Sequence, residues 1–126
     1  MGYHFIFDVK IDLKHKTRLV ARGHLNKNIP KHTSYSSVVS RESVRICFTL
    51  VVLNNQDILS GDVSNAYLNA KPLETCHVEV KDSYLFGPSE VGRTYQIVRA
   101  LYGMKSSGNA WRLYLLNILE CQLGFK

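Results

Sequence analysis

The sequence predicts an α+β fold, in which helices pack against an antiparallel sheet. Two kinds of periodicity support this prediction. Apolar and polar residues alternate in residues 4–13 and 76–81, as they do in strands with one buried face. Apolar residues recur at helical spacing in residues 40–54 and 106–123. With 126 residues and 45% hydrophobic content, the chain is expected to form one domain at most.

The first predicted element is a β-hairpin of residues 4–13 and 16–24, joined by a polar turn at 12–15. The outgoing strand has four apolar side chains on the face expected to be buried: Phe5, Phe7, Val9 and Ile11. The return strand has cationic and imidazole side chains on one face: Lys16, Arg18, Arg22 and His24. The hairpin is therefore expected to present positive charge on one side.

The middle of the chain predicts a loop, a helix and a strand. Residues 25–37 are polar and contain Pro30, which favours a loop. Ser40 can cap a helix that continues to about Asn54. Residues 56–63 then read as a central strand that ends in a turn or short helix at 64–68.

The last third alternates strands and loops before a long helix. Residues 76–81 and 94–99 predict strands that flank a loop at 82–92. A break at residues 102–103 precedes a helix that begins at Ser106 or Ser107 and continues to Leu123. This helix is apolar over much of its circumference, so burial on several faces is expected.

Positive charge is concentrated at the N-terminus. The net charge is +6, and residues 1–31 hold seven Lys or Arg against two Asp, a difference of 7 − 2 = +5. A basic N-terminal third favours a phosphate-backbone partner. A solvated basic hairpin without a ligand explains the same charge equally well.

The composition favours a cytoplasmic or nuclear protein with no membrane partner. Cys47, Cys76 and Cys121 lack the C-x-x-C spacing of a zinc site and are expected to be buried free thiols. No signal peptide is apparent, because Asp8 and Lys10 interrupt the apolar N-terminus. The longest apolar-looking run, residues 44–53, is too short to span a bilayer.

The candidate functional residues centre on residues 61–70, which read Gly-Asp-Val-Ser-Asn-Ala-Tyr-Leu-Asn-Ala. Asp62 follows the apolar pair Ile58-Leu59 and is followed at once by a small-residue turn. A strand that delivers a carboxylate to a bend can hold a divalent metal over a phosphate. An Asp that hydrogen-bonds its own backbone at a strand-to-turn junction is the alternative.

Two further segments, read with this one, resemble a known family. Residues 17–24 read Thr-Arg-Leu-Val-Ala-Arg-Gly-His, and residues 100–111 read Ala-Leu-Tyr-Gly-Met-Lys-Ser-Ser-Gly-Asn-Ala-Trp. In this order the three segments resemble the reverse transcriptase domain of Ty1/copia-type retrotransposons. That family typically reads A-R-L-V-A-[KR]-G, D-V-x-x-A-[FY]-L-N-G and A-L-Y-G-L-K-[QS]-S. The resemblance covers about residues 5–125.

The resemblance implies a partial reverse transcriptase fold of fingers and palm as a single domain over residues 1–126. About residues 4–37 would form the fingers hairpin and loop, and about residues 38–126 the remaining helices and strands. The family completes its metal site with a Tyr-x-Asp-Asp hairpin, but this sequence contains no Asp-Asp pair. The chain is thus expected to lack that hairpin and the thumb.

The resemblance also implies a two-metal nucleotidyl transfer site that uses Mg²⁺ or Mn²⁺. Asp62 would be the catalytic carboxylate and, with the carbonyl of Val63, a metal ligand. Binding of the metal by this chain alone is doubtful, because a single carboxylate does not complete the site. The deoxynucleoside triphosphate would meet Lys10 and Arg18, with Arg22 as the alternative to Arg18.

Five more residues would contact the nucleotide by resemblance. The amides of Ser64, Asn65 and Ala66 would face the triphosphate. Tyr67 would lie under the sugar and exclude a 2′-hydroxyl; a core tyrosine bonded through its hydroxyl is the alternative. Tyr102 would stack near the incoming sugar and base.

The resemblance assigns three other residues to the template and primer. Arg22 and Lys105 would contact phosphates, and Gly103 would allow close backbone approach, although Gly103 equally fits a plain helix-entry turn. An RNA or DNA primer-template and a deoxynucleoside triphosphate are the expected partners, together with the remainder of a polyprotein. The chain is thus interpreted as a copia-type reverse transcriptase fragment, inactive alone. A non-catalytic nucleic-acid-binding module and a functionless remnant are the alternatives.

Overall fold

The computed structural model of the protein describes residues 1–25 and 34–125. In this part of the chain the strands are β1 (Tyr3–Val9), β2 (His15–Ala21), β3 (His77–Glu79) and β4 (Thr94–Gln96). The α-helices are α2 (Arg41–Leu53), α3 (Ser83–Phe86) and α4 (Ser107–Asn117). Three 3-10 turns, η1 (Gly23–Leu25), η2 (Ala66–Asn69) and η3 (Pro88–Glu90), and a π-helical turn, η4 (Ile118–Gln122), complete the elements.

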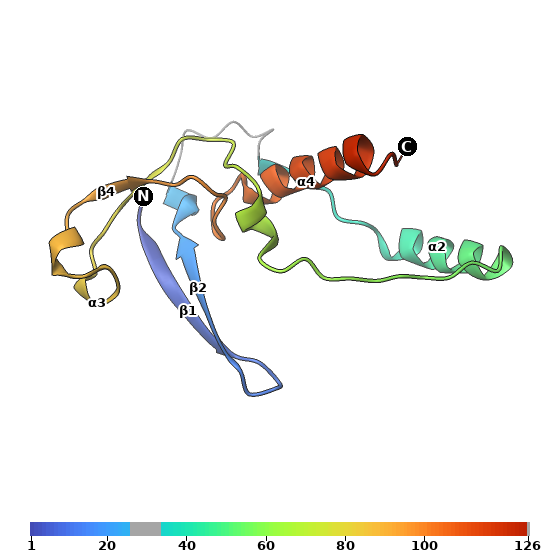
Figure 1. The fold of residues 1–126 in the computed structure, drawn as a ribbon, viewed down its shortest axis with the longest axis horizontal. Coiled ribbons are helices and arrows are strands. Elements are labelled where there is room, and N and C mark those ends of the chain that lie inside the picture. Colours follow the sequence, from blue (N-terminus) through green and yellow to red (C-terminus); the bar gives the residue numbers. More distant parts are fainter. Residues whose placement is uncertain (26–33, 126) are drawn as a thin grey trace.

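Strands and helices both occur, so the predicted α+β class is confirmed. The expectation of one sheet covered by helices is wrong, because the described strands form two separate antiparallel pairs, β1–β2 and β3–β4. The β1–β2 hairpin projects downward from the body of the molecule in Figure 1, and α2 lies apart from it at the right-hand end. None of the described helices is long and apolar enough to cross a membrane.

The N-terminal hairpin forms as predicted, with an earlier turn. β1 pairs with β2 from Tyr3 opposite Ala21 to Val9 opposite His15. The Lys10 amide donates to the Lys14 carbonyl at 3.0 Å, and the turn therefore occupies residues 10–14 rather than 12–15. After β2 the chain enters η1, so the expectation that His24 shares the strand's cationic face is wrong.

The expected buried face of the hairpin is covered only near its base. Phe5 is half-buried and meets the Tyr3 ring edge-on, with centroids 6.0 Å apart. Phe7 is 77% exposed, and Val9 and Ile11 are also exposed, which contradicts the prediction for this face. The physical reason is that the distal half of the hairpin extends beyond the elements that could cover it (Figure 1).

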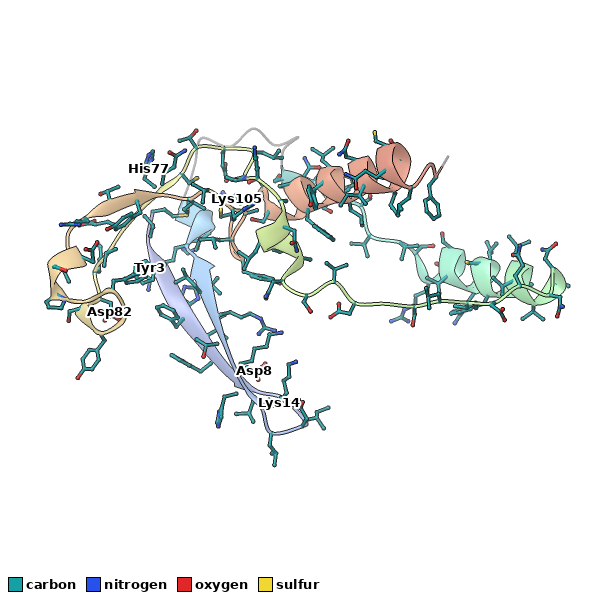
Figure 2. The ribbon with its side chains drawn as sticks, viewed as in Figure 1. Tyr3, Asp8, Lys14, His77, Asp82 and Lys105 are labelled. Carbon is teal, nitrogen blue, oxygen red and sulfur yellow. The ribbon has the colours of Figure 1, made fainter. Side chains whose placement is uncertain are left out.

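The N-terminus ties the hairpin to the second sheet. The Met1 amino group donates to the His77 carbonyl at 2.7 Å, and the Lys81 amide donates to the Tyr3 hydroxyl at 3.2 Å. Figure 2 shows Tyr3 and His77 near the base of the hairpin, whereas Lys14 lies at the hairpin's tip. These bonds fix the base of the hairpin and leave its tip unsupported.

The second sheet is shorter than predicted, and the connection between its strands is more ordered. β3 and β4 pair from His77 opposite Gln96 to Glu79 opposite Thr94. Residues 82–92, predicted as a loop, contain α3 and η3, and the Asp82 carboxylate caps α3 by accepting from the Tyr84 amide at 2.8 Å. This short-range cap gives four residues helical structure inside the connection.

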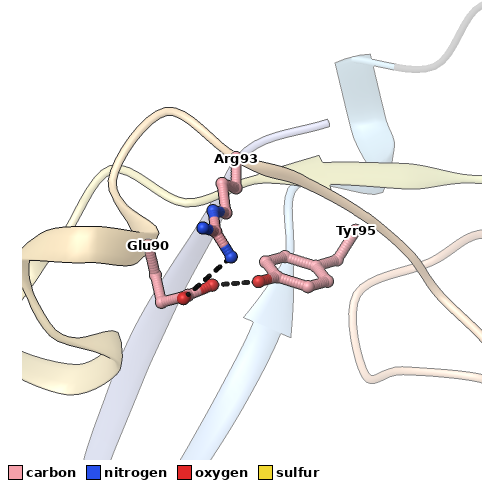
Figure 3. A network of polar contacts seen from close by, with 3 residues as sticks. All are labelled: Glu90, Arg93 and Tyr95. Carbon is pink, nitrogen blue, oxygen red and sulfur yellow. Dashed lines mark hydrogen bonds and ion pairs between the residues drawn. The ribbon is translucent and has the colours of Figure 1, made fainter.

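A polar network closes the same connection. The Glu90 carboxylate accepts from the Tyr95 hydroxyl and from Nη1 of Arg93, the latter at 3.1 Å (Figure 3). The pKa of Arg93 is raised above its usual value, first by its side-chain hydrogen bond with Tyr95 and then by the Glu90 charge. An arginine is already charged near neutral pH, so this shift has no consequence for the pH dependence of folding.

Helix α2 confirms the predicted caps, while the strand expected after it is wrong. The Ser40 hydroxyl accepts from the Ser43 amide at 3.0 Å, and Asn54 is the C-cap. The apolar side chains of α2 are largely exposed rather than packed on a sheet. Residues 56–63 form no strand: Leu59 is 99% exposed, and none of the described strands lies beside this segment to pair with it.

Helix α4 begins where predicted and is less buried than expected. Only Ser107 and Ala110 of α4 are buried, whereas Leu113 and Tyr114 are exposed. Most of the buried apolar residues of the described chain form two small clusters, which are Ala21, Cys76, Ile97 and Met104, and Ala70, Ala100 and Ala110.

Two further expectations concern the cysteines and the polar loop. All three cysteines are free thiols, but Cys47 and Cys121 are exposed, which corrects the prediction that all three are buried. Most of the loop predicted at residues 25–37 falls on residues 26–33, which lie outside the described residues.

Candidate functional site: a cleft between the hairpin and the Asp62 loop

The hairpin and the Asp62 segment line one cleft of about 590 Å³. One wall comes from the turn end of the hairpin and contains Lys10, Lys14, His15 and Lys16. The opposite wall contains residues 62–67, and Tyr102 adds a third segment. The chain thus brings together three segments that are far apart in sequence.

The wall of residues 62–67 is a tight turn. Asn65 has φ 52° and ψ 42°, a left-handed conformation that asparagine tolerates better than most residues. It leads into η2, where the Leu68 amide donates to the Asn65 carbonyl at 2.9 Å and the Ala70 amide donates to the Tyr67 carbonyl at 3.0 Å. The amides of Ala66 and Tyr67 precede the first bonded turn of η2, so this turn does not use them as donors.

Asp62 faces the cleft without being held by a strand. Its side chain is exposed and forms no hydrogen bond or ion pair with any residue in the described part of the chain. The alternative in which Asp62 bonds its own backbone is therefore not what the structure shows. An unengaged carboxylate in a cleft with three lysines is available to a ligand.

The cleft offers hard oxygen donors, but few of them. The Asp62 carboxylate and the Val63 backbone carbonyl belong to the donor class that Mg²⁺ and Mn²⁺ prefer. Within residues 1–25 and 34–125, no group of three His, Cys, Asp or Glu is placed to hold a metal ion. The donor types fit a divalent metal, while its other ligands would have to come from substrate, water or another segment.

Tyr67 and Tyr102 line the cleft, and Tyr67 also packs against buried residues. Their rings are tilted at 40° with centroids 4.8 Å apart. Tyr67 is half-buried and packs on the cluster of Ala70, Ala100 and Ala110. The core-tyrosine alternative is thus right about packing, but no hydrogen bond of the Tyr67 hydroxyl to another described residue is present.

The predicted phosphate-binding residues separate into two places. Lys10 lines the cleft, but Arg18 does not; its Nη1 lies 3.8 Å from the Asp8 carboxylate. Arg22 is exposed, and its amide donates to the Gly2 carbonyl at 2.8 Å at the base of the hairpin. Of the predicted cations, the described structure places only Lys10 in the cleft.

The sequence interpretation placed Lys16 on the cationic face of the hairpin, but it assigned none of Lys14, His15 and Lys16 to the nucleotide site, whose lining contains all three. The signal was available, since these residues flank the hairpin turn. Their positions depend on the turn, which begins two residues earlier than expected. Lys14 also pairs with Asp12 at 3.0 Å, so its charge is partly offset.

Gly103 and Lys105 lie outside the residues that line the cleft. Gly103 has φ 85°, and a Cβ there would overlap the Ala21 carbonyl oxygen and lie 2.7 Å from Cγ1 of Val20. The Ala21 amide donates to the Tyr102 carbonyl at 2.8 Å across this close approach. Gly103 therefore brings Tyr102 against β2. Lys105 is exposed and lies far from Lys14 at the hairpin tip (Figure 2).

Comparisons with known proteins identify the family of the chain. The family described as "Reverse transcriptase (RNA-dependent DNA polymerase)" matches residues 1–126. The chain is 32% identical over 127 aligned positions to the truncated transposon Ty1-A Gag-Pol polyprotein of Saccharomyces cerevisiae, covering 97% of this chain and 10% of the polyprotein. It is 31% identical to the transposon Ty1-BL Gag-Pol polyprotein of the same yeast, covering 97% and 7%.

The chain therefore spans a tenth or less of the length of these two relatives. No solved structure matches it.

Proposed function

Because this chain belongs to the reverse transcriptase (RNA-dependent DNA polymerase) family, as a segment of the Ty1/copia type, we propose that its cleft is a deoxynucleoside triphosphate site. In this proposal about residues 4–37 belong to the fingers hairpin and loop, and about residues 38–126 to the rest of the fingers and the palm. The observation that carries it is the composition of the cleft. A free carboxylate, a turn with unused amides and a lysine-rich wall face one another across about 590 Å³.

Each wall has a distinct task in this proposal. Lys10, Lys14 and Lys16 neutralise the polyphosphate, since ammonium groups near phosphate oxygens form charge-assisted hydrogen bonds. The amides of Ser64, Asn65 and Ala66 add backbone donors from the opposite wall. Arg18 would join them only by exchanging Asp8 for a phosphate.

The tyrosines hold the sugar and base. Tyr67 is fixed by its packing on the alanine cluster, so its ring can limit the space beside the 2′ position. Tyr102, 4.8 Å from Tyr67 between centroids, offers a second aromatic surface for the nucleotide. This pair would favour deoxyribonucleotides over ribonucleotides.

Asp62 and the Val63 carbonyl would hold a divalent metal. Such a metal, when bound, stabilises charge on the phosphates and on the attacking 3′-oxygen. One carboxylate does not satisfy two metals, and we propose that further carboxylates come from another segment of a longer polyprotein. The 126-residue chain alone is then expected to bind nucleotide without polymerising it.

Equilibrium binding of a deoxynucleoside triphosphate with Mg²⁺ tests the proposal. We expect Asp62→Asn to abolish the Mg²⁺-dependent part of the affinity, because the neutral amide no longer attracts the cation. Asp57→Asn is the matched control, since Asp57 is an exposed aspartate outside the residues that line the cleft. Equal affinities for the wild type and both variants would contradict the proposed site.

A nucleic-acid-binding module is the second candidate, favoured by the exposed cations of the hairpin. Arg22, Gly103 and Lys105 lie outside the cleft lining, where a template or primer backbone could reach them. We expect the affinity for a primer-template to fall with salt and to be reduced by Arg22→Ala. Affinity that does not change with salt would exclude this function.

A further inference from the structure

Asn69 connects the cleft wall to the interior of the molecule. Its side-chain amide nitrogen lies within hydrogen-bond distance of three successive backbone carbonyls, those of Ser64 at 3.4 Å, Asn65 at 3.3 Å and Ala66 at 3.4 Å, which share its two N–H groups. Carbonyl oxygens accept hydrogen bonds and cannot donate them, so the orientation of the Asn69 amide group is fixed by these neighbours. The Asn69 side chain thus contacts the carbonyl oxygens of residues 64–66 and leaves the amides of these residues unoccupied by any described residue.

The backbone of Asn69 is itself anchored. Its carbonyl accepts from Nη1 of Arg99 at 3.4 Å, and the Ala100 amide donates to the carbonyl of the next residue, Ala70, at 3.0 Å. Ala70 and Ala100 are almost completely buried. Asn69 therefore projects from a rigid base towards a turn that is exposed and has few other contacts.

The turn requires such support because its conformation is unusual. Asn65 is left-handed, which is less favourable for a residue with a Cβ than for glycine. No β-ladder holds residues 56–63 before the turn. The bonds from Asn69 are the side-chain contacts that hold residues 64–66 in the shape that lines the cleft.

We propose that Asn69 is a positioning residue for the nucleotide: it holds residues 64–66 in the left-handed turn and thereby sets the affinity of the cleft for a deoxynucleoside triphosphate. The second half of this proposal rests on the proposed function, whereas the first half concerns the turn alone. Asn69 does not line the cleft, so its effect is transmitted through the three carbonyls.

The sharpest variant is Asn69→Asp. It preserves the size of the side chain but places a carboxylate oxygen against three carbonyl oxygens, which repel it. Asn54→Asp is the matched control, because the Asn54 side chain also donates to a backbone carbonyl, that of Leu50 at 2.7 Å, at the far end of α2. Asn69→Ser, with a shorter donor, tests partial rescue.

Two readouts are taken on the same samples. The first is the dissociation constant for Mg²⁺ with a deoxynucleoside triphosphate, which we expect to rise at least about tenfold in Asn69→Asp and to stay unchanged in Asn54→Asp. The second is the NMR coupling and ¹³Cα shift of Asn65, which report its left-handed backbone without any ligand. We expect this signature to be lost in Asn69→Asp, to recover in part in Asn69→Ser, and to persist in Asn54→Asp.

The outcomes separate the two proposals. A left-handed Asn65 in Asn69→Asp, or unchanged affinity, would overturn the role of Asn69. If the wild type bound no nucleotide, the proposed function and the effect of Asn69 on affinity would both be overturned. The NMR readout would then decide the remaining claim, that Asn69 holds the turn.

Discussion

At the scale of single residues, the approach of the 102–107 segment to β2 depends on side chains that are small or absent. Gly103 permits the contact with Ala21, and among the described residues Ser106 and Ser107 are the largest side chains that are completely buried. The Ser107 hydroxyl donates to the Leu101 carbonyl at 2.6 Å, and the Ser106 hydroxyl donates to Oε1 of Glu74 at 3.0 Å. The contact of Gly103 with β2 places the neighbouring Tyr102 beside this strand, where its carbonyl accepts from the Ala21 amide at 2.8 Å.

Gly103→Ala tests the close approach. An alanine at this position must keep the left-handed backbone conformation of Gly103, and its methyl group must displace the Ala21 carbonyl. We therefore expect a loss of about 2–4 kcal/mol in the free energy of unfolding. Urea denaturation measures this loss. Gly61→Ala is the control, because a Cβ there meets nothing within 4 Å. Equal stability of the two variants would show that Gly103 is not held against β2.

Ser106→Ala tests the buried contact with Glu74. Oε2 of Glu74 is already buried without a partner, and removal of the serine hydroxyl leaves the carboxylate without its hydrogen bond. We expect a destabilisation of about 1–3 kcal/mol in urea denaturation. Ser60→Ala, at an exposed serine, is expected to leave the midpoint unchanged. A stabilised Ser106→Ala variant would contradict this account.

At the scale of elements, the sequence predicted correctly the features that depend on neighbouring residues, and it predicted poorly those that depend on distant segments. The caps of α2 and the start of α4 follow from neighbouring residues: Ser40 caps α2 as predicted, and α4 begins at Ser107, one of the two predicted starts. The strand expected at residues 56–63 was wrong, because an extended segment becomes a strand only where a partner supplies hydrogen bonds.

The same distinction applies to the site. Asp62, Tyr67 and Tyr102 were identified from their motifs, and the structure places all three at one cleft. Lys14, His15 and Lys16 were missed as cleft residues because their place depends on the geometry of the turn. Arg18 was predicted to face the triphosphate, whereas the structure pairs it with Asp8. Its role at the triphosphate stays a prediction.

Helix α2 yields a prediction at this scale. Its apolar residues are largely exposed, and an isolated helix of 13 residues is marginal in water. We expect Ser40→Ala to destabilise α2 locally by about 1 kcal/mol. Amide hydrogen exchange at Val44 should accelerate while the global unfolding midpoint stays constant, and Ser40→Asp should restore protection. A matching fall in the global midpoint would show that α2 is packed.

At the scale of the whole molecule, little large apolar surface is buried. Among the described residues, Ile97 and Met104 are the largest buried apolar side chains, whereas Phe48, Val52 and Leu59 are exposed. Folding stability grows with the apolar area removed from water, so the chain is expected to be marginally stable by itself.

The exposed apolar side chains predict that the native chain binds the dye ANS. We expect the native chain to enhance the fluorescence of ANS, and the double variant Phe48→Ser, Val52→Ser to reduce this signal without lowering the unfolding midpoint, because neither side chain is buried. Ile97→Ser, at a residue only 6% exposed, is the contrasting variant and should lower the midpoint. A lower midpoint for the exposed double variant would show that α2 is covered in solution.

The most direct measurement is an NMR map of the amides during titration with Mg²⁺ and a deoxynucleoside triphosphate. The account predicts shifts on both walls of the cleft, at Lys10, Lys14, His15 and Lys16 of the hairpin and at residues 62–67, together with Tyr102. Shifts confined to one wall, or located on α2 or the β3–β4 sheet, would contradict the claim that these segments form one nucleotide site.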